Sequence, residues 1–464
     1  MKKRQLLGLI LAVAILAGMF LIPVSELFPY AARNTLGLLC AVIVLLVTEA
    51  FPIGVICMVT VALMVVFGCV KSVPEALSGY TNQILFFVLA SFGISEALTR
   101  VPLSKRLLVA LMKAFGKNTN QLLLSIMLCV TLLSSVISNV AAAAVFIPIV
   151  QKFLDAYDDP EDRKRTAKCY MIALPVASMI GGMMTPAGSS INMLAIGLLE
   201  KHAGITIPFV EWMLMGIPLA ATMLPIAWIT CIRVYKPAAI AQSKIQQYLE
   251  HIELPDRMSG KEIYVLCIVA SMLVLWILSS WYSIFNITVV ALIGLMLFFV
   301  PGKEVMTWRQ FTGCISWEAY FLIGTMISLG AAISSSGLSG WLTATIFPAQ
   351  FAAPLAVVIG FIALLTFLLL VVIPVAPALV TMLAIPLIGF AAVTNVSPYL
   401  LIATLAFCSA NCYLLPLDTV PLMTFATGDY GMFDMPKSTV WLQIAMVILS
   451  SIWLPIVGKI LGIA

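Results

Sequence analysis

The sequence predicts an all-α polytopic membrane protein built from inverted-topology repeats, with about 11 transmembrane helices and two re-entrant hairpins. Three observations carry this prediction: the composition, the long apolar runs and the grouping of basic residues. Of the 464 residues, 62% are hydrophobic and 10% are charged, whereas a soluble domain carries roughly 25% charged residues. So little charge cannot coat a globule in water, and lipid is therefore the expected solvent.

Apolar runs of spanning length recur along the chain. Leu6–Val24 and Leu355–Val372 approach the roughly 20 residues that a spanning helix needs. Shorter runs need a few flanking residues to span: Leu36–Val47, Ile263–Leu278 and Ile287–Val300. Because these runs are continuous rather than alternating, they predict helices and not barrel strands.

The first 23 residues have a basic start and an apolar core, as a signal peptide does. A first transmembrane helix is the favoured interpretation, because many spans follow and no cleavage is needed to insert them.

Basic residues set the expected orientation. They gather at residues 2–4, 100–117, 152–168 and 233–261. The positive-inside rule places these groups, and with them the N-terminus, in the cytoplasm of a bacterial inner (plasma) membrane.

One apolar stretch conflicts with this orientation unless it is re-entrant. Leu122–Val150 lies between two cytoplasmic groups, and two full crossings would need about 40 residues. Its middle is polar, with Ser134, Ser135, Ser138 and Asn139. We therefore expect a hairpin of two short helices whose polar tip lies at membrane depth. Such a break is tolerated only where it lines a cavity or is buried in protein.

The two halves of the chain resemble each other weakly, in the same order. Residues 86–107 resemble 320–342, residues 136–150 resemble 375–388, and residues 183–193 resemble 414–423. The basic 97–117 region has an uncharged counterpart at 332–350, which is the charge pattern of an inverted repeat. A second hairpin is then expected at Phe351–Phe390, entering from the opposite side.

Five segments follow from this pattern. Residues 1–120 form a scaffold part with an amphipathic helix at 102–117, which either lies in the membrane interface or is a plain linker. The others are a transport part at 121–235, a cytoplasmic connector at 236–260, a second scaffold part at 261–350 and a second transport part at 351–464.

The first candidate site is the tip with Ser134, Ser138 and Asn139. Hydroxyl and amide oxygens are neutral hard ligands that suit Na⁺, and the helix after the tip directs its N–H groups at an anion. The alternative is a Ser/Asn cluster that holds helices together.

The second candidate is the break at Thr185–Asn192. Pro186 and Gly188 interrupt a span, and Ser189 with Ser190 then starts a new half-helix that can hold a carboxylate. The alternative is a plain kinked helix.

Two further candidates lie in the second half. Leu415–Pro421 carries Asp418, an acid expected near mid-membrane that is paired, protonated, bound to a cation or extended into a water-filled cleft. The second tip, Pro374–Ala378, has two prolines and no side-chain oxygen. It offers freed backbone groups, or it is only a kinked span.

No residue set suits catalysis. The sequence has two histidines, His202 and His251, and no CxxC pair or P-loop. We therefore expect neither an enzyme nor an ATP-driven pump.

With these residues in hand, the chain resembles the divalent anion:sodium symporter family of di- and tricarboxylate transporters. The residues that carry the resemblance are Ser138-Asn139-Val140 at the first tip, 188–192 in the first broken helix, and Thr419 with Pro421 in the second. The resemblance implies a homodimer that works by an elevator motion. It also implies one Na⁺ site at Ser134, Ser138, Asn139 and the backbone of Gly188. Substrate contacts are expected from Ser138, Asn139, Ser189, Ser190, Asp418 and Thr419.

Three departures from the family pattern concern the coupling ions. Val140 replaces a Thr, Ala376-Pro377-Ala378 stands where a second Ser-Asn-Thr is expected, and Asp418 replaces a small residue. The leading hypothesis is Na⁺-coupled symport of C4 dicarboxylates, 2-oxoglutarate or citrate. Sodium-independent carboxylate exchange and proton linkage through Asp418 remain open. Sulfate, phosphate or arsenite transport, a channel, and a membrane-embedded enzyme are further alternatives.

Overall fold

Helices account for the regular structure of the protein. The computed structural model describes residues 3–116, 118–245, 254–255, 257–282, 284–346, 353–394 and 396–463. Seven helices in these ranges are long and apolar enough to cross a membrane. They are α1 with its 3₁₀ extension (Lys3–Leu21), α2 (Tyr30–Thr48), α11 (Phe209–Tyr235), α13 (Gly260–Leu278), α16 (Trp317–Ser335), α18 (Leu355–Val372) and α22 (Pro436–Leu461).

The remaining predicted spans are short, bent or broken. α3 (Ile53–Val66) and α14 (Ile287–Leu297) are short. α14 ends before the predicted Val300, because the residue before Pro301 disfavours helix. α5 (Gln83–Thr99) bends by 62° into α6 (Leu103–Phe115), the predicted amphipathic helix.

Two spans are interrupted, as predicted. α9 (Pro160–Gly182) is followed by the 3₁₀ turn η3 (Pro186–Gly188) and α10 (Ser190–Ala203), and α20 (Pro398–Ala410) is followed by α21 (Thr419–Phe425). The short elements are α4 (Val73–Ala76), η2 (Ser78–Thr81), α15 (Trp308–Cys314) and α17 (Leu338–Ile346).

Each half contains a helix pair packed against its broken helix. α7 (Thr119–Ser134) and α8 (Asn139–Leu154) both contact α9, and α18 and α19 (Ala376–Thr394) both contact α20. α7 and α8 have 16 residues each, a rise of about 24 Å, which is less than the roughly 30 Å hydrocarbon core. This length suits a re-entrant hairpin. The second pair is longer, with 18 and 19 residues, and residues 351–352 of the predicted hairpin lie outside the described residues.

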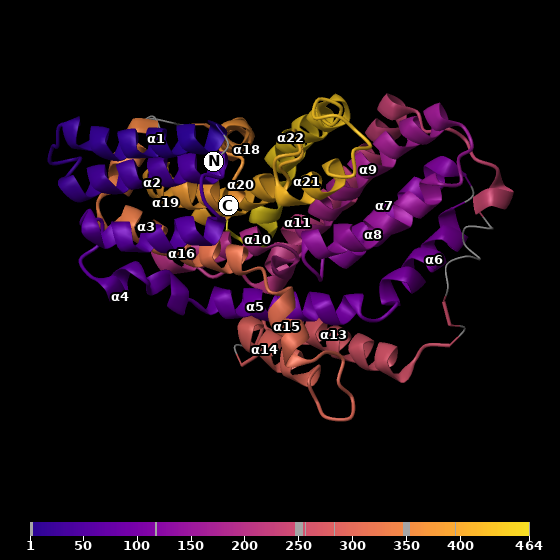
Figure 1. The fold of residues 1–464 in the computed structure, drawn as a ribbon. Helices are drawn as coiled ribbons and strands as arrows, with labels where there is room; N and C mark the ends of the chain where they lie inside the picture. The colour runs from indigo at the N-terminus through magenta and orange to yellow at the C-terminus, as the bar shows by residue number, and fades with distance from the viewer. Residues whose placement is uncertain are drawn as a thin grey trace.

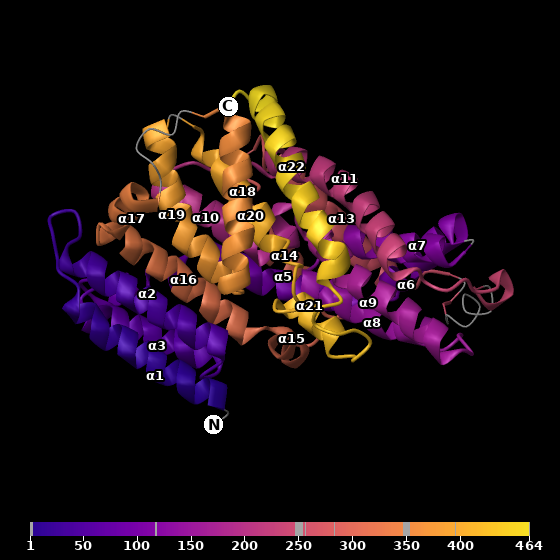
Figure 2. The same cartoon turned by 90° about the horizontal axis from the view of Figure 1, so that it is seen from above.

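The two halves exchange helices. α10 packs on α19 and α20 of the second half, whereas α21 packs on α8 and α9 of the first. α5 likewise contacts α14, and α16 contacts α3. In Figures 1 and 2, α10 and α20 lie centrally, between α1–α3 at one edge and α6–α9 at the other. The reciprocal packing agrees with the predicted inverted repeat.

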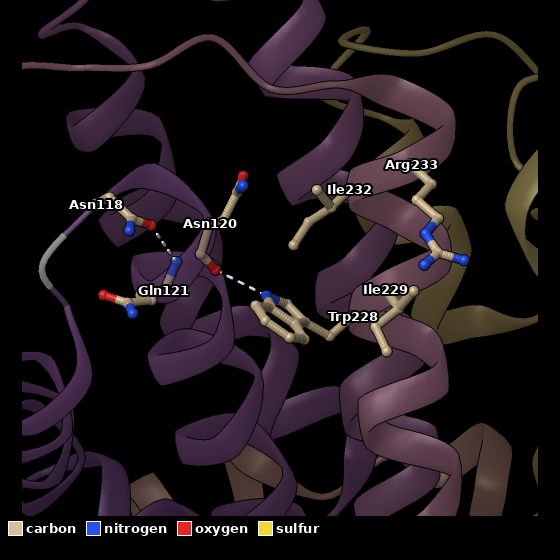
Figure 3. A pocket seen from close by; sticks show the side chains of 7 residues that line it. All are labelled: Asn118, Asn120, Gln121, Trp228, Ile229, Ile232 and Arg233. Atoms are coloured by element: carbon tan, nitrogen blue, oxygen red, sulfur yellow. Dashed lines mark hydrogen bonds between the residues drawn. The ribbon is translucent and has the colours of Figure 1, made fainter.

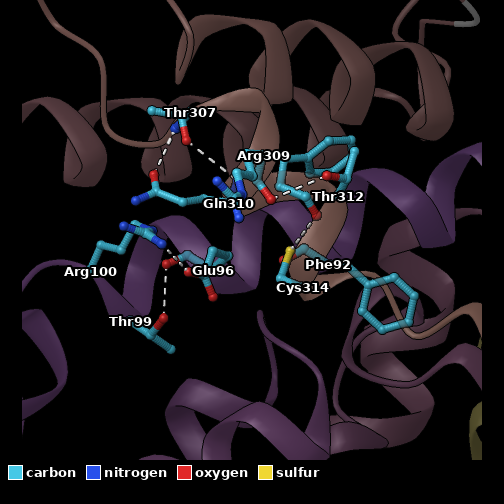
Figure 4. A network of polar contacts seen from close by, with 10 residues as sticks. Phe92, Glu96, Thr99, Arg100, Thr307, Arg309, Gln310, Thr312 and Cys314 are labelled. Atoms are coloured by element: carbon cyan, nitrogen blue, oxygen red, sulfur yellow. Dashed lines mark hydrogen bonds and ion pairs between the residues drawn. The ribbon is translucent and has the colours of Figure 1, made fainter.

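A polar contact joins the middle of α5 to the C-terminal end of α15 (Figure 4). Cys314 Sγ lies 3.6 Å from the carbonyl oxygen of Phe92, and Arg100 pairs with Glu96 within the last turns of α5 at 2.7 Å. The division into scaffold and transport parts remains a prediction, and residues 246–253 and 256 of the connector lie outside the described residues.

Candidate functional site

The first hairpin tip is shaped by helix-capping side chains. α7 ends at Ser134, and α8 begins at Asn139 with Ser138 as its N-cap. Ser138 Oγ accepts a hydrogen bond from the N–H of Ala141 at 3.3 Å, and the Ser138 N–H donates to Ser95 Oγ at 3.2 Å. Ser and Asn favour such caps because they satisfy the free N–H groups of a helix start. The tip is thus a defined turn and not an irregular loop.

The Asn139 side chain is the centre of the site. We assign its amide so that Nδ2 donates to Ser134 Oγ at 2.7 Å, to the Gly188 carbonyl oxygen at 3.1 Å and to the Ser178 carbonyl oxygen at 3.3 Å. In the opposite orientation the amide oxygen would face only acceptors. Neutral oxygens from the hairpin, from α9 and from the η3 turn therefore converge on the Asn139 amide nitrogen. The same oxygens suit a hard monovalent cation when the amide turns its own oxygen toward them.

Two residues of α9 complete this cluster, and the sequence did not single them out. Buried Ser178 donates from its Oγ to the Asn139 carbonyl oxygen at 2.7 Å, and its Oγ lies 3.1 Å from Ser134 Oγ. A Cβ added to Gly182 would lie 2.2 Å from the end of the Asn139 side-chain amide, so only glycine leaves room for this side chain. The sequence signal that could have found Gly182 was the Gly181-Gly182 pair just before the break.

The turn between α9 and α10 is tied to the tip. Thr185 Oγ1 donates to the Ser135 carbonyl oxygen at 2.6 Å and accepts from the Gly188 N–H at 3.0 Å. Asn192 Nδ2 donates to the carbonyl oxygens of Gly182 and Thr185, while its buried Oδ1 has no hydrogen-bond partner among the described residues. The break is therefore a rigid structure, held in one geometry by side chains.

The two serines predicted to bind an anion, Ser189 and Ser190, differ in position and exposure at the start of α10. Ser189 is the N-cap and accepts from the Ile191 N–H at 3.3 Å, whereas Ser190 is exposed in the first helical position. The positive N-terminal end of α10 lies beside the negative C-terminal end of α9, because α9 ends and α10 begins at the same break. A cation and an anion can thus be held side by side.

The second break has a different local structure. Asp418 is the N-cap of α21 and accepts from the Val420 N–H at 3.2 Å, and the Thr419 side chain is exposed. Before it, Asn411 Nδ2 donates to the Phe407 carbonyl oxygen of its own helix, and to no other acceptor among the described residues. Asn411 Oδ1 and the Tyr413 hydroxyl are buried and unpartnered among the described residues.

The second tip lacks the links found at the first. Its Ala378 is buried, and Thr381 Oγ1 bonds the Pro377 carbonyl oxygen within α19 at 2.9 Å. Within the described part of the chain, no hydrogen bond joins residues 373–378 to residues 411–418. Ser134, Asn139 and Gly188 are therefore brought together directly, with Ser138 adjoining them at the tip, whereas Asp418 and Thr419 belong to a separate break.

A comparison with models of known protein families identifies the family of this chain. The family model described as "Sodium:sulfate symporter transmembrane region" matches residues 3–463. The chain belongs to this family.

Two named relatives are similar to this member of the sodium:sulfate symporter family along most of their length. This chain is 27% identical over 474 residues to the sodium-dependent dicarboxylate transporter SdcS of Staphylococcus aureus (strain USA300). The alignment covers 96% of this chain and 89% of that protein. The chain is 27% identical over 446 residues to SdcS of Staphylococcus saprophyticus, covering 90% and 84%. The YdaH transporter of Alcanivorax borkumensis, whose topology is described as unusual, shares the fold with a TM-score of 0.57 at 13% identity. That likeness covers 99% of this chain and 98% of the other.

Proposed function

We propose that this protein is a secondary active transporter that carries di- or tricarboxylate anions across the bacterial plasma membrane in symport with Na⁺. The similarity to proteins named sodium-dependent dicarboxylate transporters supports the substrate class and the ion. The proposal includes a homodimer, a cytoplasmic N-terminus and an elevator motion of the two hairpins with their broken helices, as the family resemblance implies.

The convergence at Asn139 carries this proposal. Ser134, Ser178 and Gly188 supply oxygens around its amide, and Ser189 opens α10 next to them. Na⁺ at the oxygen cluster would favour a carboxylate at the α10 N-terminus, and the carboxylate would favour Na⁺ in turn. Because each ligand lowers the electrostatic cost of the other, this geometry couples their movement.

Uptake by proteoliposomes tests the proposal. Purified protein is reconstituted, and uptake of labelled succinate, malate, tartrate, citrate and 2-oxoglutarate is measured with a Na⁺ or a choline gradient. We expect uptake that needs external Na⁺ and no internal anion. Uptake that needs an internal anion and ignores Na⁺ would show an exchanger instead. A channel would show no counterflow with trapped substrate.

Proton linkage through Asp418 is the second candidate. Its carboxylate is half-buried at the start of α21 and forms no ion pair with any described residue. A carboxylate in this position is expected to be protonated or to hold a cation. Asp418→Asn keeps the capping oxygen and removes the charge. If this variant retains the parental pH and Na⁺ dependence of uptake, Asp418 has no part in coupling.

A further inference from the structure

A cavity of about 340 Å³ lies outside the candidate site, between the start of α7 and the last turns of α11 (Figure 3). Asn118, Asn120 and Gln121 line it from α7 and its preceding turn. Trp228, Ile232 and Arg233 line it from α11. The cavity is open at the surface, and neither the proposed cation nor the proposed anion site contributes to it.

The cavity lies near the end of α11, where the lipid headgroups of a surrounding bilayer are expected. Its α11 residues lie within seven positions of Tyr235, the end of that helix, a rise of about 10 Å at about 1.5 Å per residue. The polar interface of a bilayer occupies roughly 5–7 Å on each side of the hydrocarbon. The exposed Lys113 and Lys236 lie near the adjoining helix ends, on the side predicted to be cytoplasmic.

The lining is polar on one side and apolar on the other. Arg233 is exposed and forms no ion pair with any described residue. Gln121 Oε1 is shielded from solvent and has no hydrogen-bond partner among the described residues. Trp228 Nε1 donates to the Asn120 carbonyl oxygen at 2.7 Å, which closes the inner wall and leaves the indole ring beside Ile232 in the cavity (Figure 3).

We propose that this cavity binds an anionic glycerophospholipid such as phosphatidylglycerol. The phosphate pairs with Arg233, because a guanidinium presents several donors to phosphate oxygens. An acyl chain covers Trp228 and Ile232. Basic cavities between helices on the cytoplasmic side are suited to such headgroups.

The occupied cavity would tie α7 to α11. Gln121 is 13 residues before Ser134 on the same helix, a rise of about 20 Å. Bound lipid therefore acts on the arm that carries the oxygen cluster at its other end, and we expect it to stabilise the folded protein against thermal unfolding.

Native mass spectrometry and thermal unfolding of the full-length, delipidated protein test this site. Phosphatidylglycerol, phosphatidylcholine and inorganic phosphate are added separately to the parent, to Arg233→Gln and to Arg309→Gln. Arg309 is a matched control, because it is an exposed arginine on α15 that does not line the cavity. We expect phosphatidylglycerol to be retained and to raise Tm in the parent and in Arg309→Gln, and retention to fall at least five-fold in Arg233→Gln.

Three results would overturn the proposal. They are equal retention of phosphatidylglycerol by Arg233→Gln and the parent, equal retention of phosphatidylcholine and phosphatidylglycerol by the parent, and an equal Tm increase with inorganic phosphate. The last result would identify a site for free phosphate. If Arg233→Gln does not fold, Ile232→Asp replaces it, because a charge on the wall that the acyl chain covers should give the same loss. Equal retention of phosphatidylglycerol by Ile232→Asp and the parent would then contradict the proposal.

Discussion

The two broken helices share an architecture but differ in how their polar groups are satisfied. At the first break, Ser134, Ser178, Thr185 and the Asn139 amide all form hydrogen bonds across helices. At the second, the Ser409 hydroxyl, Asn411 Oδ1 and the Tyr413 hydroxyl are buried and unpartnered among the described residues, whereas the first break has a single such atom among them, Asn192 Oδ1. Each such atom costs about 1–3 kcal/mol when no ligand or water reaches it. The comparison teaches that the first break is preorganised, whereas the second depends on something it binds.

The largest expected effect comes from removing the space for Asn139. In Gly182→Ala, the new Cβ would overlap the Asn139 amide and displace it from the oxygens of Ser134 and Gly188. We expect kcat/KM for Na⁺-driven uptake to fall on the order of 100-fold, or about 2.7 kcal/mol. Gly340→Ala on α17 is the control, because nothing lies within 4 Å of a Cβ added at that position. If Gly182→Ala transports as well as the parent, Asn139 is not part of the transport site.

Thr185→Val should have a smaller effect on the first break. The variant loses the donor to the Ser135 carbonyl oxygen and the acceptor for the Gly188 N–H. We expect roughly a 10-fold rise in the Na⁺ concentration for half-maximal uptake, since about 1.4 kcal/mol is tenfold. Thr404→Val is the matched control in α20, where the hydroxyl bonds the Leu400 carbonyl oxygen of its own helix and no other group within the described part of the chain. Equal Na⁺ dependence in both variants would contradict a preorganised first break.

A pair of hydroxyl deletions compares the two breaks directly. Ser178→Ala removes a hydroxyl that bonds Asn139 and Ser134, and should destabilise the protein by about 1 kcal/mol. Tyr413→Phe removes an unpartnered hydroxyl and should leave stability unchanged or raised by about 1 kcal/mol. Thermal unfolding of both variants measures the difference. A loss of stability in Tyr413→Phe would mean that its hydroxyl already has a partner before any substrate is added.

The smallest effect concerns an ionic contact between the halves, at Asp434. Partial burial raises the pKa of Asp434, but hydrogen bonds from Lys437, the Gly431 N–H and Lys168 outweigh it and hold that pKa well below its usual range. A carboxyl with a lowered pKa contributes stability above its unfolded pKa of about 4, and loses it as pH falls toward the folded value. Asp434→Asn should therefore lower Tm by a few degrees at pH 7 and less at pH 3. A pH-independent Tm difference would contradict this origin.

The sequence predicted the class of the fold and the centre of the first site. Ser134, Asn139 and Gly188 were identifiable because polar residues, proline and glycine interrupt apolar runs, which is costly in a membrane unless they are used. Ser178 was not identifiable, because one serine within an apolar helix has no local signature and its role depends on which helix packs against it. The second break was located by its prolines and Asp418, but the buried Asn411 and Tyr413 became apparent only from packing.

The exchange of α10 and α21 between the halves has a consequence for how the chain is made. α10 ends at Ala203, yet its packing partners α19 and α20 are complete only when Ala410 has been synthesised. Until Ala410 has been synthesised, the oxygen cluster beside α10 therefore lacks the helices of the second half that surround it. The N-terminal half expressed alone should therefore insert into the membrane without a finished site, and co-expression of the C-terminal half should supply the missing wall in trans.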